Sequence, residues 1–289
     1  MQQFLLEVFD LVEAEMENEH SAPLQLRAMG FCGVDDSVSQ ELLIMMSEKY
    51  PFIEWGILFR PDLEGTPRYA SWKWTNDLRE LELQRARKSD VGVTNPLRLA
   101  AHLCGSRCQD ILDGDISFVR ELRGLGFLRV QINATKANNV SVDLKRLTAL
   151  SQNLRVSILA EPTIEWILQY NDETKCLLDG FLLDPIPNMS ILYDSSCGLG
   201  IQMKDFPIPD RADMLHGYAG GINPNNVKDI LSRIENVSRG KPVWVDMESS
   251  LRMKVLEESG NLKDCFSIEK CMACIKIWEE FLKKDILNK

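Results

Sequence analysis

Eight short apolar segments, separated by stretches patterned as amphipathic helices, run through this chain of 289 residues. The segments are 28–35, 53–61, 99–105, 128–135, 155–162, 191–198, 216–222 and 243–250. No two of them are joined by an Asn-Gly turn of the kind that closes β-hairpins, so parallel strands are favoured. Strand and helix alternating eight times, mostly at intervals of about 25 to 35 residues, is the pattern of a parallel eight-stranded (β/α)8 TIM barrel. A doubly wound open sheet normally has fewer repeats and a glycine-rich turn after its first strand, which is missing here. We therefore expect an α/β barrel.

The residues before the first apolar segment are predicted to form an extra N-terminal helix. One face of it would carry Phe4, Leu5, Val8 and Leu11 or Val12. This stretch has no basic n-region and no small-residue cleavage site, so a signal peptide is not expected. The predicted domains are a helical extension over 1–24 and a barrel over 25–289.

Composition excludes several classes of partner. A net charge of −10 argues against nucleic acid, which is bound by clustered Lys and Arg. No apolar run approaches the roughly 20 residues of a membrane span.

Eight irregularly spaced cysteines suggest reduced thiols and a cytoplasmic location. The C-x-x-C pair Cys271 and Cys274 lies in a helical pattern without a second pair, so buried thiols are favoured over a zinc site.

Polar residues stand at the ends of several predicted strands, which is where barrel enzymes build their active sites. Cys32 and Asp194 each end a predicted strand. Three sets lie at alternate positions and so share one face of their strand: His102 with Cys104, Arg129 with Gln131 and Asn133, and Asp246 with Glu248. Polar side chains at alternate positions of apolar strands are not needed to fill a core. They predict a polar pocket.

At these positions the sequence resembles one family, the phosphoribosylanthranilate isomerases. "GFCGVDD" resembles the family's first strand K-I-C-G, "PRYAS" its S-P-R loop and "RVQINAT" its V-Q-L-H-G. "ILYDSSCGLGI" resembles L-L-D followed by a glycine-rich turn, "YAGGINPNNV" resembles A-G-G-L-N-P-E-N-V, and "VWVDMESSLR" resembles V-D-V-S-S-G-V-E. The six matches follow the family's order, each at or just after a predicted strand end.

The resemblance implies an isomerase of the aldose–ketose type, an intramolecular oxidoreductase of tryptophan biosynthesis. Its Amadori rearrangement turns an N-phosphoribosyl aminobenzoate into an open-chain amino-ketose, with a general acid at the ring oxygen and a general base at the adjacent carbon. By position, Cys32 matches the base, Asp194 the acid and Arg68 the cation that meets the substrate anion. We expect Asp194 rather than Asp184 in the pocket, because only Asp194 leads into a glycine turn. No metal or other cofactor is implied.

A phosphate cradle is expected after the seventh and eighth segments, where barrels often bind phosphate. Gly220 and Gly221 would allow close backbone approach, and Asn223 would cap a helix that starts at Pro224. The expected substrate- and phosphate-binding residues are Arg68, Gln131, Asn133, Gly198, Gly200, Gly220, Gly221, Asn223, Asp246, Glu248, Ser249 and Ser250. The expected partner is a small phosphorylated molecule, with no nucleic acid or membrane partner, and a homodimer is left open.

Two positions depart from the family pattern. Asn133 replaces a histidine, and Glu248 replaces a serine beside the expected phosphate. Like charges about 4 Å apart repel by ~1 kcal/mol in water and by several times more in a partly dry pocket. Glu248 therefore requires a compensating cation, and the candidates are Arg60, Arg68 and Arg252.

Two further readings stay open. Carboxylates on the inner face could hold magnesium or calcium in an aldolase or hydrolase, since these ions prefer oxygen ligands. The candidate ligands are Glu161, Asp194, Asp246 and Glu248, with His102. The chain could also be a barrel that has lost isomerase activity and binds a metabolite or a partner protein.

Overall fold

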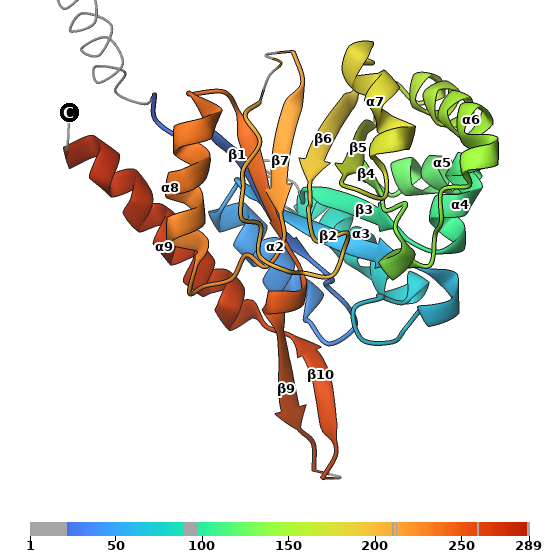
Figure 1. The fold of residues 1–289 in the computed structure, drawn as a ribbon. Helices are drawn as coiled ribbons and strands as arrows, with labels where there is room; N and C mark the ends of the chain where they lie inside the picture. Colours follow the sequence, from blue (N-terminus) through green and yellow to red (C-terminus); the bar gives the residue numbers. More distant parts are fainter. Residues whose placement is uncertain (1–21, 89–96, 210, 212, 259, 288–289) are drawn as a thin grey trace, which may run out of the picture.

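The computed structural model describes residues 22–88, 97–209, 211, 213–258 and 260–287. Eight parallel strands close into a barrel in chain order, so that β1 pairs with both β2 and β8 (Figure 1). The strands are β1 Leu26–Cys32, β2 Ile53–Phe59, β3 Leu99–Leu103, β4 Arg129–Ile132, β5 Glu165–Tyr170, β6 Met189–Tyr193, β7 Leu215–Ala219 and β8 Val243–Met247. This topology confirms the predicted (β/α)8 TIM barrel. The helix predicted over 1–24 falls outside the described residues, apart from 22–24.

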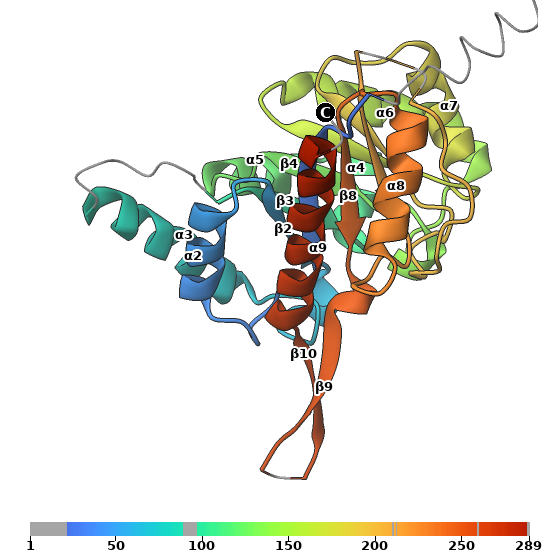
Figure 2. The same cartoon turned by 90° about the vertical axis from the view of Figure 1, so that its left-hand side faces the viewer.

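Helices surround the barrel, and α8 and α9 lie side by side on one flank (Figures 1 and 2). The α-helices are α2 Gln40–Lys49, α3 Trp72–Lys88, α4 Ser106–Leu112, α5 Ser117–Gly124, α6 Leu147–Ala160, α7 Lys175–Leu183, α8 Val227–Ser238 and α9 Ile268–Leu287. Short 3-10 turns are η1 Pro61–Leu63, η2 Lys136–Asn138, η3 Leu144–Arg146 and η4 Ser249–Leu251. The described part of the connection from β6 to β7 carries no helix. No described helix combines the length and apolarity needed to cross a bilayer.

The fifth strand is not where the sequence pattern places it. Residues 155–162 form the end of α6 and its cap, and β5 follows them. The apolar run there is helical because Leu150, Leu154 and Ile158 are buried at a spacing of four, whereas Val156 is exposed. The true strand was missed because glutamate and glutamine interrupt its apolar residues.

The barrel interior below the strand ends is charged. Arg129 of β4 is buried and pairs with Glu54 and Glu165, each at 2.8 Å. Its guanidinium also lies over the ring of Trp244, 4.4 Å from the centroid. Residues at period two along β4 therefore form layers, with Arg129 beneath Gln131.

An antiparallel hairpin, β9 Arg252–Leu256 with β10 Leu262–Phe266, projects from the end of the barrel where the strands terminate (Figures 1 and 2). The chain then enters α9, whose Cys271 and Cys274 are fully buried in the core. All eight cysteines are free thiols. The C-x-x-C pair thus packs as small apolar side chains.

Candidate active site at the carboxyl end of the barrel

A polar cleft with an accessible volume of about 130 Å³ opens at the carboxyl ends of the strands. Most of the predicted site residues line it, because parallel strands of a barrel all end at one rim. These lining residues are Arg68, Gln131, Asn133, Asp194, Gly198, Gly200, Gly220, Gly221, Asp246, Glu248, Ser249 and Ser250.

Asn223 is a predicted site residue that does not line this cleft. It is also not a helix cap, because α8 begins at Val227 with Asn226 at the cap position. The carbonyl of Asn223 accepts hydrogen bonds from the backbone N–H groups of Asn226 and Val227, at 3.1 and 2.9 Å. Its side chain donates to the carbonyl of Gly221 at 2.9 Å. A turn therefore separates the paired glycines from the helix, and the predicted direct strand-to-helix junction was wrong.

Several lining residues were absent from the predicted binding set. They include Tyr69, His102, Asn138, Gln169 and Ser196. Gln169 was not predicted because it lies on the fifth strand, which the sequence pattern misplaced. His102 was predicted as one of the strand-end residues of a polar pocket and as a possible metal ligand, but it was not included in the binding set.

A thiol, an imidazole and a carboxyl group meet in the floor of the cleft. Cys32, only 2% exposed and outside the lining itself, donates its S–H to Oδ1 of Asp246 at 2.6 Å. Nε2 of His102 lies 3.5 Å from the same sulfur. Gly56 on β2 provides the room, because a Cβ there would lie 2.5 Å from the sulfur and 2.9 Å from that ring nitrogen. A larger residue at this position would separate the three groups.

Burial sets the protonation of this cluster. It raises the pKa of Asp246 from 3.8 to about 7, against the lowering effect of the hydrogen bond from Cys32. Burial and the charge of Asp246 raise the pKa of Cys32 well above its ordinary value. Burial and the cation of Arg129 lower the pKa of His102 to about 3. Near neutral pH the thiol keeps its proton and the imidazole is neutral, so Asp246 is the group suited to proton exchange.

The same three residues are the one group of candidate metal ligands within 4.8 Å of one another in the described chain. In a tetrahedral zinc site with bonds of about 2.3 Å to sulfur and 2.0–2.2 Å to oxygen, these two ligand atoms are about 3.5 Å apart. The sulfur of Cys32 and Oδ1 of Asp246 are 2.6 Å apart, which is too close for both atoms to ligate one zinc ion as they lie. The arrangement is instead that of a thiol directed at a carboxyl oxygen.

Asp194 follows β6, and both of its carboxylate oxygens accept hydrogen bonds from the protein. Oδ2 accepts from Nε2 of Gln169 at 2.6 Å and from the backbone N–H of Gly198 at 3.0 Å. Oδ1 accepts from the hydroxyl of Ser196 at 2.5 Å and from its N–H at 3.1 Å. Asp194 thus organises the turn after β6 and lines the cleft as well.

Two other carboxylates considered from sequence lie away from the cleft. Asp184 follows α7, is largely exposed and pairs with Arg155 at 2.9 Å. Glu161 follows α6, at the opposite end of the barrel from the cleft, and pairs with Arg120 at 2.8 Å and Arg123 at 2.5 Å. Glu161 is therefore not part of the carboxylate set proposed for magnesium or calcium. The other members line the cleft, but among the described residues no three of them form a group within 4.8 Å.

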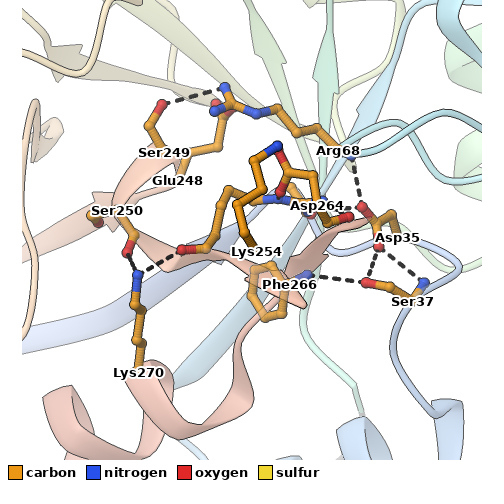
Figure 3. Close-up of polar contacts among 12 residues, drawn as sticks. Asp35, Ser37, Arg68, Glu248, Ser249, Ser250, Lys254, Asp264, Phe266 and Lys270 are labelled. Atoms are coloured by element: carbon orange, nitrogen blue, oxygen red, sulfur yellow. Dashed lines mark hydrogen bonds and ion pairs between the residues drawn. The ribbon is translucent and has the colours of Figure 1, made fainter. Parts of the chain in front are cut away.

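Arg68 supplies the cation that Glu248 requires. Its Nη1 lies 3.3 Å from Oε1 of Glu248 and 3.4 Å from Oγ of Ser249 (Figure 3). Arg68 adopts a φ of +80°, a region disfavoured for a residue with a Cβ. Its N–H donates to Oδ2 of Asp35 at 2.7 Å, which helps to hold this conformation. The guanidinium predicted to meet a substrate anion is thus already paired.

Arg252 connects two segments at the rim of the cleft. It is buried and contacts Asp35 at 2.7 Å, Asp264 at 2.8 Å and the carbonyl of Gly33 at 2.9 Å. These contacts join the loop after β1 to the base of the hairpin, where Asp35 and Asp264 lie close together (Figure 3). Arg252 therefore does not serve as the partner of Glu248. Arg60 does not either, because it pairs with Asp62 at 3.1 Å.

The paired glycines after β7 are contacted by the chain's own backbone. Gly221 has a φ of +62°, and a Cβ on it would lie 2.6 Å from the backbone nitrogen of Gln202. A Cβ on Gly220 would lie 2.8 Å from the carbonyl oxygen of Ile201. Close backbone approach does occur here, but the approaching segment is the loop after β6.

No protein-family model and no curated protein matches the sequence. Among solved structures, a phosphoribosylanthranilate isomerase from Thermotoga maritima, crystallised as monomers generated from the dimeric protein, aligns with a TM-score of 0.46 and 14% identity. That alignment covers 88% of this chain and 97% of the other. A citrate lyase from Burkholderia xenovorans aligns with a TM-score of 0.40 and 10% identity, over 78% of this chain and 74% of the other. At these values neither match assigns a function.

Proposed function

We propose that this protein is an acid–base isomerase of the aldose–ketose type that acts on a sugar-amine in the cleft. The observation that carries the proposal is Asp246, a cleft-lining carboxyl with a pKa of about 7 that is hydrogen-bonded to the Cys32 thiol. A general base works best when its pKa lies near the operating pH. The family resemblance supplies the reaction class.

The proposed proton transfers balance through solvent. The ring oxygen receives a proton as its bond to the amine-bearing carbon breaks and an iminium ion forms, and Asp246 then takes the proton from the adjacent carbon to give an enolamine. The enolamine becomes the ketosamine when the amine-bearing carbon takes a proton from water and the enol hydroxyl releases one, and Asp246 passes its own proton to water.

Asp194 is proposed as the acid. In the free protein it accepts hydrogen bonds as a carboxylate, so one of its oxygens must exchange a protein hydrogen bond for one to the substrate and take up a proton from water before donating it to the ring oxygen. Cys32 keeps its proton and positions Asp246, a change from the predicted role of base.

Turnover of ribosylamine and of N-ribosyl aminobenzoates, each with and without a 5-phosphate, tests the proposal. Asp246→Asn and Asp194→Asn should each lower kcat by at least about 100-fold, the usual contribution of a general acid or base. Asp184→Asn is the matched control, because that aspartate is exposed and lies outside the cleft. Absence of turnover by the native protein on every member of the panel would reject the isomerase.

A second candidate function is ligand binding without turnover. The position of Cys32 favours it, because the residue that matches the family's base lies beneath the cleft floor and holds its proton. A ligand that raises the melting temperature while no product forms under any condition would support this candidate.

A further inference from the structure

We infer that the cleft binds a small polyhydroxylated amine that carries no phosphate, and that Glu248 sets this specificity. The inference rests on the proposed function, because it names the substrate class of the same site. It departs from the phosphorylated ligand expected from the sequence.

The charge of the cleft favours a cation over an anion. Among the described residues that line it, the acidic side chains are Asp194, Glu248 and Asp246, the last with a pKa of about 7, and Arg68 is the one Lys or Arg. That arginine is engaged by Glu248 at 3.3 Å and by Ser249 at 3.4 Å. A phosphate would have to displace Glu248 from Arg68 and then lie beside its negative charge.

Two buried hydrogen-bond acceptors, on residues that line the cleft, have no partner within the described chain. They are the side-chain carbonyl oxygens of Gln131 and Gln169, each on a residue that is 4% exposed and lines the cleft. The orientation of Gln169 is determined because its amide nitrogen donates to Asp194 at 2.6 Å, and a carboxylate only accepts. A buried acceptor without a donor is costly, so these carbonyls call for a ligand rich in N–H and O–H groups. An ammonium and sugar hydroxyls provide such donors, whereas a fully ionised phosphate provides none.

The feature that most suggested a phosphate has another explanation. Gly220 and Gly221 were expected to bring bare backbone against an anion, but the close contact is made by Ile201 and Gln202. The glycines are therefore required by the fold of the loop after β6, whether or not an anion binds.

Calorimetry with the full-length protein tests the inference without needing turnover. The probes are 1-amino-1-deoxyfructose, which is a stable ketosamine, together with ribose 5-phosphate and inorganic phosphate. The native protein should bind the ketosamine and give no binding heat with either phosphate compound. Glu248→Ser should weaken ketosamine binding by about tenfold or more and strengthen ribose 5-phosphate binding by about tenfold.

Two further variants complete the design. Gln131→Met removes one unpartnered acceptor at similar volume and should weaken ketosamine binding. Glu279→Ser on the exposed face of α9 is the control and should change neither ligand. Tighter native binding of ribose 5-phosphate than of the ketosamine, or no ketosamine binding, overturns the inference. Turnover of phosphorylated substrates alone would support the isomerase and contradict the inferred specificity. Ketosamine binding without any turnover would support the specificity and contradict the isomerase.

Discussion

Replacing Asp246 with asparagine should make the protein more stable above neutral pH. The folded pKa of about 7 lies above the ordinary value of 3.8 because the carboxyl is buried. Between these two values the folded protein holds a proton that the unfolded chain releases, so the free energy of unfolding falls as the pH rises. At 1.36 kcal/mol for each pKa unit, the loss is about 4 kcal/mol in full, of which about 3 kcal/mol falls between pH 5 and pH 8.

Asparagine removes this titration, and its carbonyl oxygen can still accept the hydrogen bond from Cys32. Urea unfolding at several pH values should therefore show the free-energy difference between variant and native protein growing by about 3 kcal/mol from pH 5 to pH 8, in favour of the variant. Asp184→Asn, at an exposed site, should follow the native curve. Parallel curves for native protein and Asp246→Asn would refute a raised pKa at this carboxyl.

Three further outcomes follow from the packing. Gly221→Ala should lower the free energy of unfolding by about 1–3 kcal/mol, because it adds a Cβ at positive φ against the loop after β6; a melt in urea unchanged from native would contradict this contact. Iodoacetamide at pH 8 should modify exposed Cys176 and spare Cys32, and peptide mass spectrometry showing equal labelling would contradict the buried thiol. Arg252→Met should destabilise the fold by about 3–5 kcal/mol by leaving Asp35 buried without its cation, and recovery in a double variant with Asp35→Asn would verify the cause.

The barrel could be predicted because its determinants are local. Apolar runs, their spacing and the absence of hairpin turns between them are all visible in a single sequence. The one misplaced strand shows where this fails, because "RVSILA" is apolar as a run, and only the burial of Leu154 and Ile158 on one side marks it as a helix. The hairpin after β8 was also missed, since it lies outside the repeating pattern.

The candidate site could be predicted as a set of positions but not as chemistry. Strand ends converge in any barrel, so Asp194, Asp246 and Glu248 could be expected near one another. The protonation of Asp246 depends on its burial beside Cys32, which is 214 residues away in the sequence. The choice of Arg68 among three possible partners of Glu248 likewise depends on how separate loops pack.

The most direct test of the proposed chemistry follows one proton. A sugar-amine deuterated at the carbon next to the amine-bearing carbon is incubated with the native protein, and the label is followed by NMR. In the proposed mechanism Asp246 takes this proton at a cleft open to water, so the deuterium should pass to solvent as the ketosamine forms. Asp246→Asn should slow this loss by at least about 100-fold. Retention of the label with the native protein, or equal loss with Asp246→Asn, would contradict proton transfer at this carboxyl.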